Sequence, residues 1–259
     1  MGTALVVLFQ FYLFPNSLEP LWREDSLVEY LQSLLFLSAS FAQLYIAVRL
    51  IQNHGNRRRT IFHLLLLLLF FLVAMEEISW GQRIFGWETP PFLEDNLQGE
   101  TNIHNIFTGF FSPFHLALVL FINTYCYVLP LARHLSLDVR KILDRIQLPI
   151  IPIDLVSIFI IADIVRPIGL EHLDGQLTVI LSLIPLGLFI SRRPSRLFEI
   201  LEKPALQVSC ICLIGMITTL LGLFGPPIPT LWLWESRELL FGLGFMSYSL
   251  FEARFIMSR

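Results

Sequence analysis

The stretch IFHLLLLLLFFLVAMEEISW, residues 61–80, decides the fold class of this chain. Residues 61–75 contain no Asp, Glu, Lys or Arg, and Glu76 and Glu77 follow them directly. A helix needs about 20 mostly apolar residues to cross the hydrocarbon of a bilayer. The stretch therefore predicts a membrane-spanning helix with an acidic pair at one end.

The whole chain shares this apolar character. Of its 259 residues, 55% are hydrophobic and 15% are charged, whereas a soluble domain of this length needs a more polar surface. Its net charge of -3 gives no nucleic-acid signal, so we expect membrane lipids as partners and no nucleic acid. The three cysteines, Cys126, Cys210 and Cys212, lie in apolar runs and are interpreted as packing residues.

The predicted fold is an all-α polytopic membrane bundle, a single transmembrane domain over residues 1–259, with about eight spans. The spans are predicted near residues 2–16, 27–50, 61–80, 110–132, 148–169, 175–191, 204–224 and 236–254. The first is short, and the count falls to seven if it does not cross the membrane. It lacks a basic leader and a cleavage site, so we expect no cleaved signal peptide.

Lys and Arg residues predict the orientation of the spans. They gather in alternate connecting segments: Arg49 and Arg57–Arg59, then Arg133, Arg140, Lys141 and Arg145, then Arg192, Arg193, Arg196 and Lys203, and finally Arg254 and Arg259. The positive-inside rule places these segments in the cytoplasm. We therefore expect both termini to be cytoplasmic, in a plasma membrane of the bacterial inner-membrane type.

One of these basic segments, residues 133–147, has a second pattern. Its apolar residues Leu135, Val139, Ile142 and Ile146 form a stripe opposite the cations when they are placed on a helix. Such a pattern is typical of a helix that lies on a membrane surface. The segment is predicted to be a cytoplasmic amphipathic linker.

Acidic residues gather on the opposite, extracytoplasmic side. Four groups stand at the ends of different predicted spans: Asp25 with Glu29, Glu76 with Glu77, Glu100 with His104, and Glu235 with Glu238. Two carboxylates 5–6 Å apart repel by roughly 3 kcal/mol at an effective dielectric near 20. If these groups converge, they must take up protons, pair with the arginines Arg83, Arg166 and Arg237, or bind a cation.

The extracytoplasmic loop, residues 81–109, is the richest in polar residues. If helix continues past Trp80, then Glu76, Trp80 and Arg83 share one helix face. The prolines Pro90 and Pro91 then force a loop.

A metal site is expected where this loop returns to the membrane. Glu100 and His104 have the i, i+4 spacing of two ligands if helix begins before Glu100, and lose that geometry if Thr101 is the helix cap. We predict that Glu77, Glu100 and His104 hold a divalent metal ion. The alternative for His104 is a capping or interface histidine.

Two acids lie inside a predicted span, Asp154 and Asp163, where charge is costly and often functional. They are nine residues apart, so they point about 180° away from each other on a helix. We expect Asp163 to pair with Arg166, and Asp154 to serve the membrane interface.

The string Glu76-Glu77-Ile78-Ser79-Trp80-Gly81-Gln82-Arg83, with Gly99-Glu100 and His104-Asn105 after it, resembles a signature of bacterial polytopic membrane proteins without assigned function. This resemblance covers roughly residues 76–105 and implies no activity. The ceramidase-like membrane hydrolases, which hold a metal through three histidines, are similar in architecture only. No His-x-x-x-His pair occurs in this chain, so no residue role is carried over.

Three functions fit these patterns. The first is a metal-assisted hydrolase or transferase acting on a lipid or lipid-linked substrate, with Glu76, Glu77, Glu100 and His104 as ligands or general base. In that enzyme, Arg83 would steer an anionic head group. The second is a proton- or cation-coupled transporter, although no inverted repeat is found in the sequence. The third is a non-catalytic membrane scaffold whose acids make structural hydrogen bonds.

Overall fold

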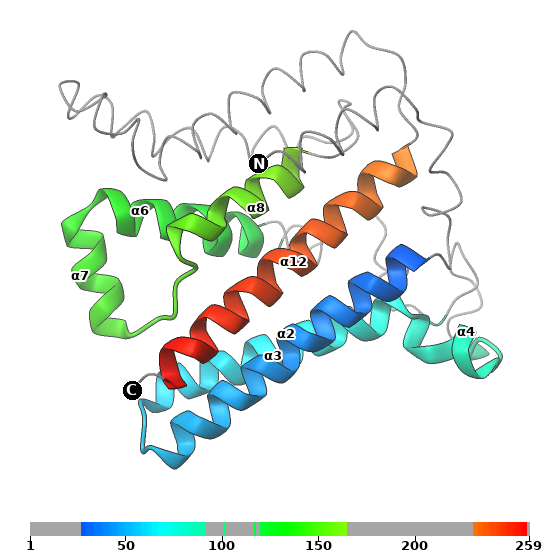
Figure 1. Cartoon of the computed structure of the whole chain (residues 1–259), viewed down its shortest axis with the longest axis horizontal. Coiled ribbons are helices and arrows are strands. Elements are labelled where there is room, and N and C mark those ends of the chain that lie inside the picture. The colour runs from blue at the N-terminus through cyan, green and yellow to red at the C-terminus, as the bar shows by residue number, and fades with distance from the viewer. Residues whose placement is uncertain (1–26, 92–100, 102–116, 118–119, 165–229, 258–259) are drawn as a thin grey trace, which may run out of the picture.

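The computed structural model describes residues 27–91, 101, 117, 120–164 and 230–257 (Figure 1). All regular elements in these ranges are helical. They are α2 (Leu27–Gln52), α3 (Arg57–Glu77), the 3-10 turn η3 (Ser79–Gly81), α4 (Gln82–Phe85), the π-helix η6 (Asn123–Val128), α6 (Leu129–Leu135), α7 (Leu137–Ile146), α8 (Ile153–Ile164) and α12 (Thr230–Met257). The all-α fold class is therefore confirmed for this part of the chain.

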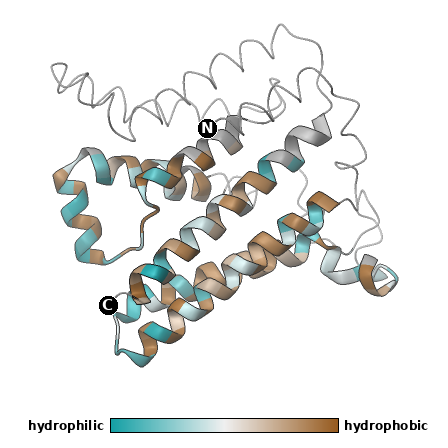
Figure 2. Cartoon of the chain, in the orientation of Figure 1, coloured by the Kyte–Doolittle hydropathy of each residue, from teal (hydrophilic) through white to brown (hydrophobic). Residues whose placement is uncertain are grey.

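Three of these helices are long and apolar enough to cross a membrane. They are Leu27–Gln52, Arg57–Glu77 and the segment Arg237–Met257 of α12. Each coincides with a span expected from the sequence, and hydrophobic residues occupy much of their length (Figure 2). The remaining expected spans fall wholly or partly outside the described residues, so the total of eight stays a prediction.

A tight turn joins α2 to α3 as an antiparallel pair. The Gly55 N–H donates to the Leu50 carbonyl at 2.7 Å, and His54 adopts a left-handed backbone with φ 49°. The Asn56 side chain then caps α3 by accepting hydrogen bonds from the Arg58 and Arg59 N–H groups. These local interactions make residues 53–56 the break between α2 and α3, in the gap between the predicted spans 27–50 and 61–80.

The third long helix, α12, packs against both α2 and α8 (Figure 1). Two glycines permit this approach. A Cβ at Gly242 would lie 3.2 Å from the Leu35 side chain, and a Cβ at Gly244 would lie 2.7 Å from the Phe159 ring. Small residues at such positions allow membrane helices to pack closely.

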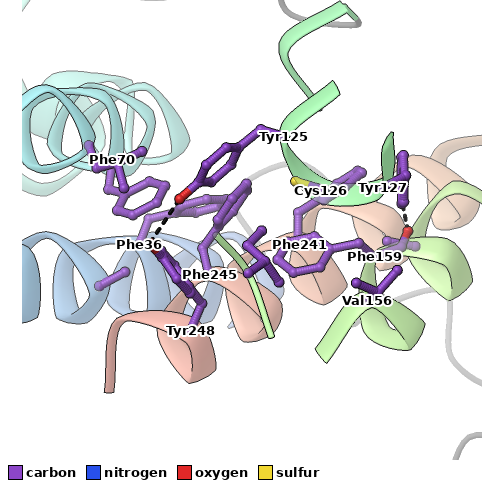
Figure 3. Packing of buried hydrophobic residues seen from close by; sticks show 14 of the residues in the cluster. Phe36, Phe70, Tyr125, Cys126, Tyr127, Val156, Phe159, Phe241, Phe245 and Tyr248 are labelled. Atoms are coloured by element: carbon purple, nitrogen blue, oxygen red, sulfur yellow. Dashed lines mark hydrogen bonds between the residues drawn. The ribbon is translucent and has the colours of Figure 1, made fainter. Parts of the chain in front are cut away.

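Aromatic rings fill the middle of the bundle. The ring of Phe245 lies 4.8 Å from that of Phe70, 4.9 Å from that of Phe159 and 6.3 Å from that of Phe36, measured between centroids (Figure 3). These distances are typical of favourable aromatic pairs. The rings come from four helices, α2, α3, α8 and α12, and make one shared apolar layer.

Two tyrosine hydroxyls attach η6 to its neighbours (Figure 3). The hydroxyl of Tyr125 lies 2.8 Å from that of Tyr248 in α12 and 2.9 Å from the Pro149 carbonyl. The Tyr127 hydroxyl donates to the Phe159 carbonyl at 2.9 Å. Buried hydroxyls need such partners, and here they anchor the π-helix.

The structure decides a condition that the sequence left open near the acidic pair. The condition that helix continues past Trp80 is not met, because α3 ends at Glu77 and the chain turns at Ser79–Gly81. Three successive residues with positive φ interrupt the helical hydrogen bonds there. Trp80 therefore hydrogen-bonds to Glu76 from a turn, and no continuous helix face joins Glu76 to Arg83.

Candidate functional site

Carboxylates from three helices converge at one end of the bundle. The Glu77 carboxyl group, at the end of α3, interacts electrostatically with those of Glu29 in α2, Glu76 in α3, and Glu235 and Glu238 in α12. All three helices begin or end at this level (Figure 1). These five residues are called the carboxylate cluster below.

A buried amide belongs to the same place. The Gln32 Nε2 group donates to the Glu235 carboxylate at 2.9 Å and to the Glu235 carbonyl at 2.8 Å. Both side chains are buried. The other end of this amide, Gln32 Oε1, has no hydrogen-bond partner among the described residues. A buried carbonyl oxygen without a donor is costly, and a proton on a neighbouring carboxyl group or a cation would satisfy it.

The turn after α3 is strained. Ser79 and Trp80 have φ of 46° and 55°, a region that residues with a Cβ rarely occupy, and Gly81 follows with φ 82°. The indole Nε1 of Trp80 donates to Glu76 Oε1 at 2.6 Å, which ties the turn to the carboxylate cluster. Strain of this kind persists only where the surroundings enforce it, and it is common at functional sites.

Gln82 holds two parts of the following loop together. Its Nε2 donates to Thr89 Oγ1 at 2.8 Å, and its Oε1 accepts a hydrogen bond from the Thr101 N–H at 2.6 Å. One side chain therefore connects the turn after α3 to chain positions 7 and 19 residues later. Thr101 stands between Glu100 and His104 in the sequence, so the return of the loop begins beside this turn.

Of the five site residues expected from the sequence, the structure describes some and not others. Glu76 and Glu77 belong to the carboxylate cluster. The backbone of Arg83 lies in α4, but its side chain is outside the description. Glu100 and His104 lie outside the described residues. Within the ranges that are described, no three His, Cys, Asp or Glu residues are placed to hold a metal ion.

Asp154 and Asp163, the two acids expected inside the predicted span 148–169, contribute less to the description of a site. Asp154 lies exposed in the first turn of α8, consistent with an interfacial position. The side chain of Asp163 and the whole of Arg166 are outside the description, so their pairing remains a prediction.

A second polar cluster lies at the other end of the same three helices, where the sequence had not indicated one. The Gln43 amide donates to Ser249 Oγ at 2.8 Å, and Gln43 Oε1 lies 2.6 Å from His63 Nδ1. Below them, Arg59 pairs with Glu252 at 2.6 Å. Gln43, His63 and Ser249 are fully buried. We call these five residues the inner polar cluster.

Sequence reasoning missed Gln32 and the inner polar cluster for one reason. Each helix contributes isolated polar residues to an apolar run, and the run alone does not say which of them face each other. A signal was present in α2: Gln32 and Gln43 are eleven residues apart, which is three helical turns and thus one face.

Comparison with protein-family models, with curated proteins and with solved structures finds no match for this chain.

Proposed function

We propose that the carboxylate cluster is the working site of a multi-pass membrane protein that acts on a lipid or lipid-linked substrate as a metal-assisted hydrolase or transferase. The observation that carries the proposal is that four other carboxyl groups, from three helices, lie within electrostatic range of Glu77. Clustered carboxylates at the end of a bundle repel one another unless protons, arginines or a cation offset their charge. Of these three ways to offset the charge, a divalent cation would also activate a water molecule or the substrate.

Three features support a site of this kind. Gln32 brings a buried oxygen without a described partner to the cluster, and oxygen is the ligand that hard cations prefer. The strained turn fixes Trp80 against Glu76, which holds one carboxylate in place. Gln82 draws Thr101 to the same turn. The neighbours Glu100 and His104 are the further ligands that we propose.

Within this proposal, the chain's own groups have separate roles. Glu77, Glu100 and His104 would hold the ion, which would supply polarisation of the scissile group or activation of a water molecule. Glu76, oriented by the hydrogen bond from the Trp80 indole, would act as the general base that accepts a proton from water. Arg83 steers an anionic head group toward the site.

Metal content of the purified full-length chain tests the proposal. We expect one divalent ion per chain by elemental analysis, lost in Glu77→Gln and in Glu100→Gln. Glu88→Gln is the matched control, because Glu88 is exposed in the same region and lies outside the cluster. Thermal unfolding of each variant separates loss of metal from loss of fold. A native chain without metal, or a folded Glu77→Gln that keeps it, would contradict the proposal.

A proton- or cation-coupled carrier is the second candidate, and the inner polar cluster favours it. Polar side chains line both ends of the interface among α2, α3 and α12, and the rings of Phe36, Phe70 and Phe245 separate them. An occluded carrier has this arrangement of two polar ends and one apolar barrier. Ion flux into proteoliposomes would be measured with protein that contains no bound metal. Flux in the native chain that is lost in Glu77→Gln would favour the carrier.

A further inference from the structure

Helix α7 has an apolar edge that the described part of the protein does not cover. Leu143 is buried, with 5% of its surface exposed, whereas Ile142 and Ile146 are 58% and 40% exposed. Leu143, which is not part of the stripe expected from the sequence, packs on the protein. Ile142 and Ile146 of that stripe form an edge that faces outward.

The cations of α7 are exposed beside this apolar edge. Arg140, Lys141 and Arg145 are all exposed. On a helical projection Arg140 and Lys141 fall on the side away from Ile142 and Ile146, and Arg145 flanks Ile142, roughly 60° around the helix from it. An apolar edge bordered by Lys and Arg is the pattern of helices that lie in the interface of a membrane.

The position of α7 is held by its ends. The backbone of Ser136 is extended, so the chain changes direction between α6 and α7, and the Ser136 hydroxyl accepts a hydrogen bond from the Val139 N–H. Arg133 of α6 pairs with Asp144 of α7 at 2.9 Å. At the far end, Gln147 has a left-handed backbone with φ 55°, which terminates the helix.

The region around α7 carries a net positive charge, and its acids are already engaged in ion pairs. Residues 133–146 contain four cations (Arg133, Arg140, Lys141, Arg145) and two acids (Asp138, Asp144), a net charge of +2 with His134 neutral. The two acids already pair with Arg133, Lys141 and, at 4.0 Å, Arg140. Arg145 has no acid within the helix left to pair with, so the face is suited to anions.

The orientation of α7 suits a membrane surface. In Figure 1, α7 runs across the direction of α12 rather than along it. It lies toward the carboxyl end of α12, the end at which Arg254 stands and near which Arg57–Arg59 begin α3. This is the basic side of the bundle, where a helix lying in the membrane plane meets lipid head groups.

We infer that α7 lies in the head-group region of the basic leaflet and binds anionic phospholipids. Ile142 and Ile146 enter the boundary of the acyl chains, while Arg140, Lys141 and Arg145 bind head-group phosphates. A lipid surface fits better than a second protein chain, because the apolar edge is narrow and is bordered by cations. This inference is independent of the chemistry proposed for the carboxylate cluster.

Site-directed spin labelling of the full-length chain in lipid nanodiscs tests the position. In a chain whose three cysteines are replaced by alanine, labels are placed at Ile142→Cys and, as the matched control on the cationic side, at Lys141→Cys. We expect collisions with oxygen to dominate for Ile142→Cys, and collisions with a water-soluble nickel chelate to dominate for Lys141→Cys. Equal access of the chelate to both labels, or no access of either reagent to Ile142→Cys, would overturn the inference.

Lipid selectivity tests the partner. The triple variant Arg140→Gln, Lys141→Gln, Arg145→Gln is compared with the native chain for association of spin-labelled phosphatidylglycerol and phosphatidylcholine. We expect a several-fold drop in the preference for phosphatidylglycerol, since each cation near a surface attracts anionic lipid. Arg58→Gln controls for a general loss of charge on the same side. An unchanged preference in the folded triple variant would overturn the role of these cations.

Discussion

At the scale of single residues, two buried glutamines join the same pair of helices at different depths. Gln32 bonds to Glu235, and Gln43 bonds to Ser249, so both connect α2 to α12. Hydrogen bonds between membrane helices are each worth roughly 0.6–2 kcal/mol. Neither amide can turn toward lipid without losing its partner. These two residues therefore set the rotation of α2 about its own axis.

The strained turn gives a prediction at this scale. Gly81→Ala places a Cβ 3.0 Å from the Phe85 ring on a backbone with φ 82°, and Gly86→Ala places one in open space at φ 68°. A left-handed backbone costs a residue with a Cβ roughly 1–2 kcal/mol. Both variants should lose about that much stability, and Gly81→Ala should lose more because of its contact.

Thermal unfolding in detergent, followed by tryptophan fluorescence, measures this difference. Gly81→Ala should also move Trp80 away from Glu76 and change its emission, while Gly86→Ala should leave the emission unchanged. Equal stability of the two variants would mean that the turn accommodates the extra methyl group.

At the scale of elements, one ion pair joins α3 to α12 at the end of the bundle where α3 begins. The Arg59 and Glu252 side chains are 21% and 9% exposed, and their charged atoms lie 2.6 Å apart. A mostly buried pair adds little net stability compared with apolar residues, but the loss of one partner leaves an uncompensated charge. The pair should therefore behave asymmetrically in mutants.

A double-mutant cycle tests this behaviour. Arg59→Gln or Glu252→Gln alone should each destabilise the chain by about 3 kcal/mol, toward the lower end expected for a buried pair because Arg59 is partly exposed. The double variant should cost much less than their sum. Arg58→Gln, an exposed neighbour, should change unfolding by less than about 0.5 kcal/mol. Additive single effects would contradict the coupling.

At the scale of the whole molecule, α3 is long and apolar enough to separate two surfaces on opposite sides of a membrane. Its 21 residues span about 31 Å, close to the thickness of the hydrocarbon. The turn with His54 precedes it, and Trp87 follows it. Both side chains are exposed.

Cysteine labelling in intact cells tests this arrangement and its direction. In the cysteine-free chain, Trp87→Cys should react with a membrane-impermeant maleimide in intact spheroplasts. His54→Cys should react only after the membrane is permeabilised. Ala39→Cys, at a buried position in α2, is the unreactive control. Labelling of both exposed positions from one side would contradict the span, and the reversed pattern would contradict the orientation.

The sequence by itself predicted the all-α class, the three described helices that are long and apolar enough to cross a membrane, and the break between α2 and α3. These follow from the length of apolar runs and from local turn chemistry, which depend on neighbouring residues alone. It also identified Glu76, Glu77, Glu29, Glu235 and Glu238 as residues at the ends of spans, because acids concentrate where Lys and Arg are absent.

Only the tertiary structure decided which polar residues meet. The rotation and contact of helices decide three features. Gln32 pairs with Glu235, the inner polar cluster assembles, and one edge of α7 is buried while another is exposed. A lipid-facing stripe and a protein-facing stripe are equally apolar, so hydropathy does not distinguish them. The left-handed turn at Ser79–Gly81 was hidden for a related reason, because the hydrogen bond from Trp80 to Glu76 helps to hold a backbone that Ser and Trp do not favour on their own.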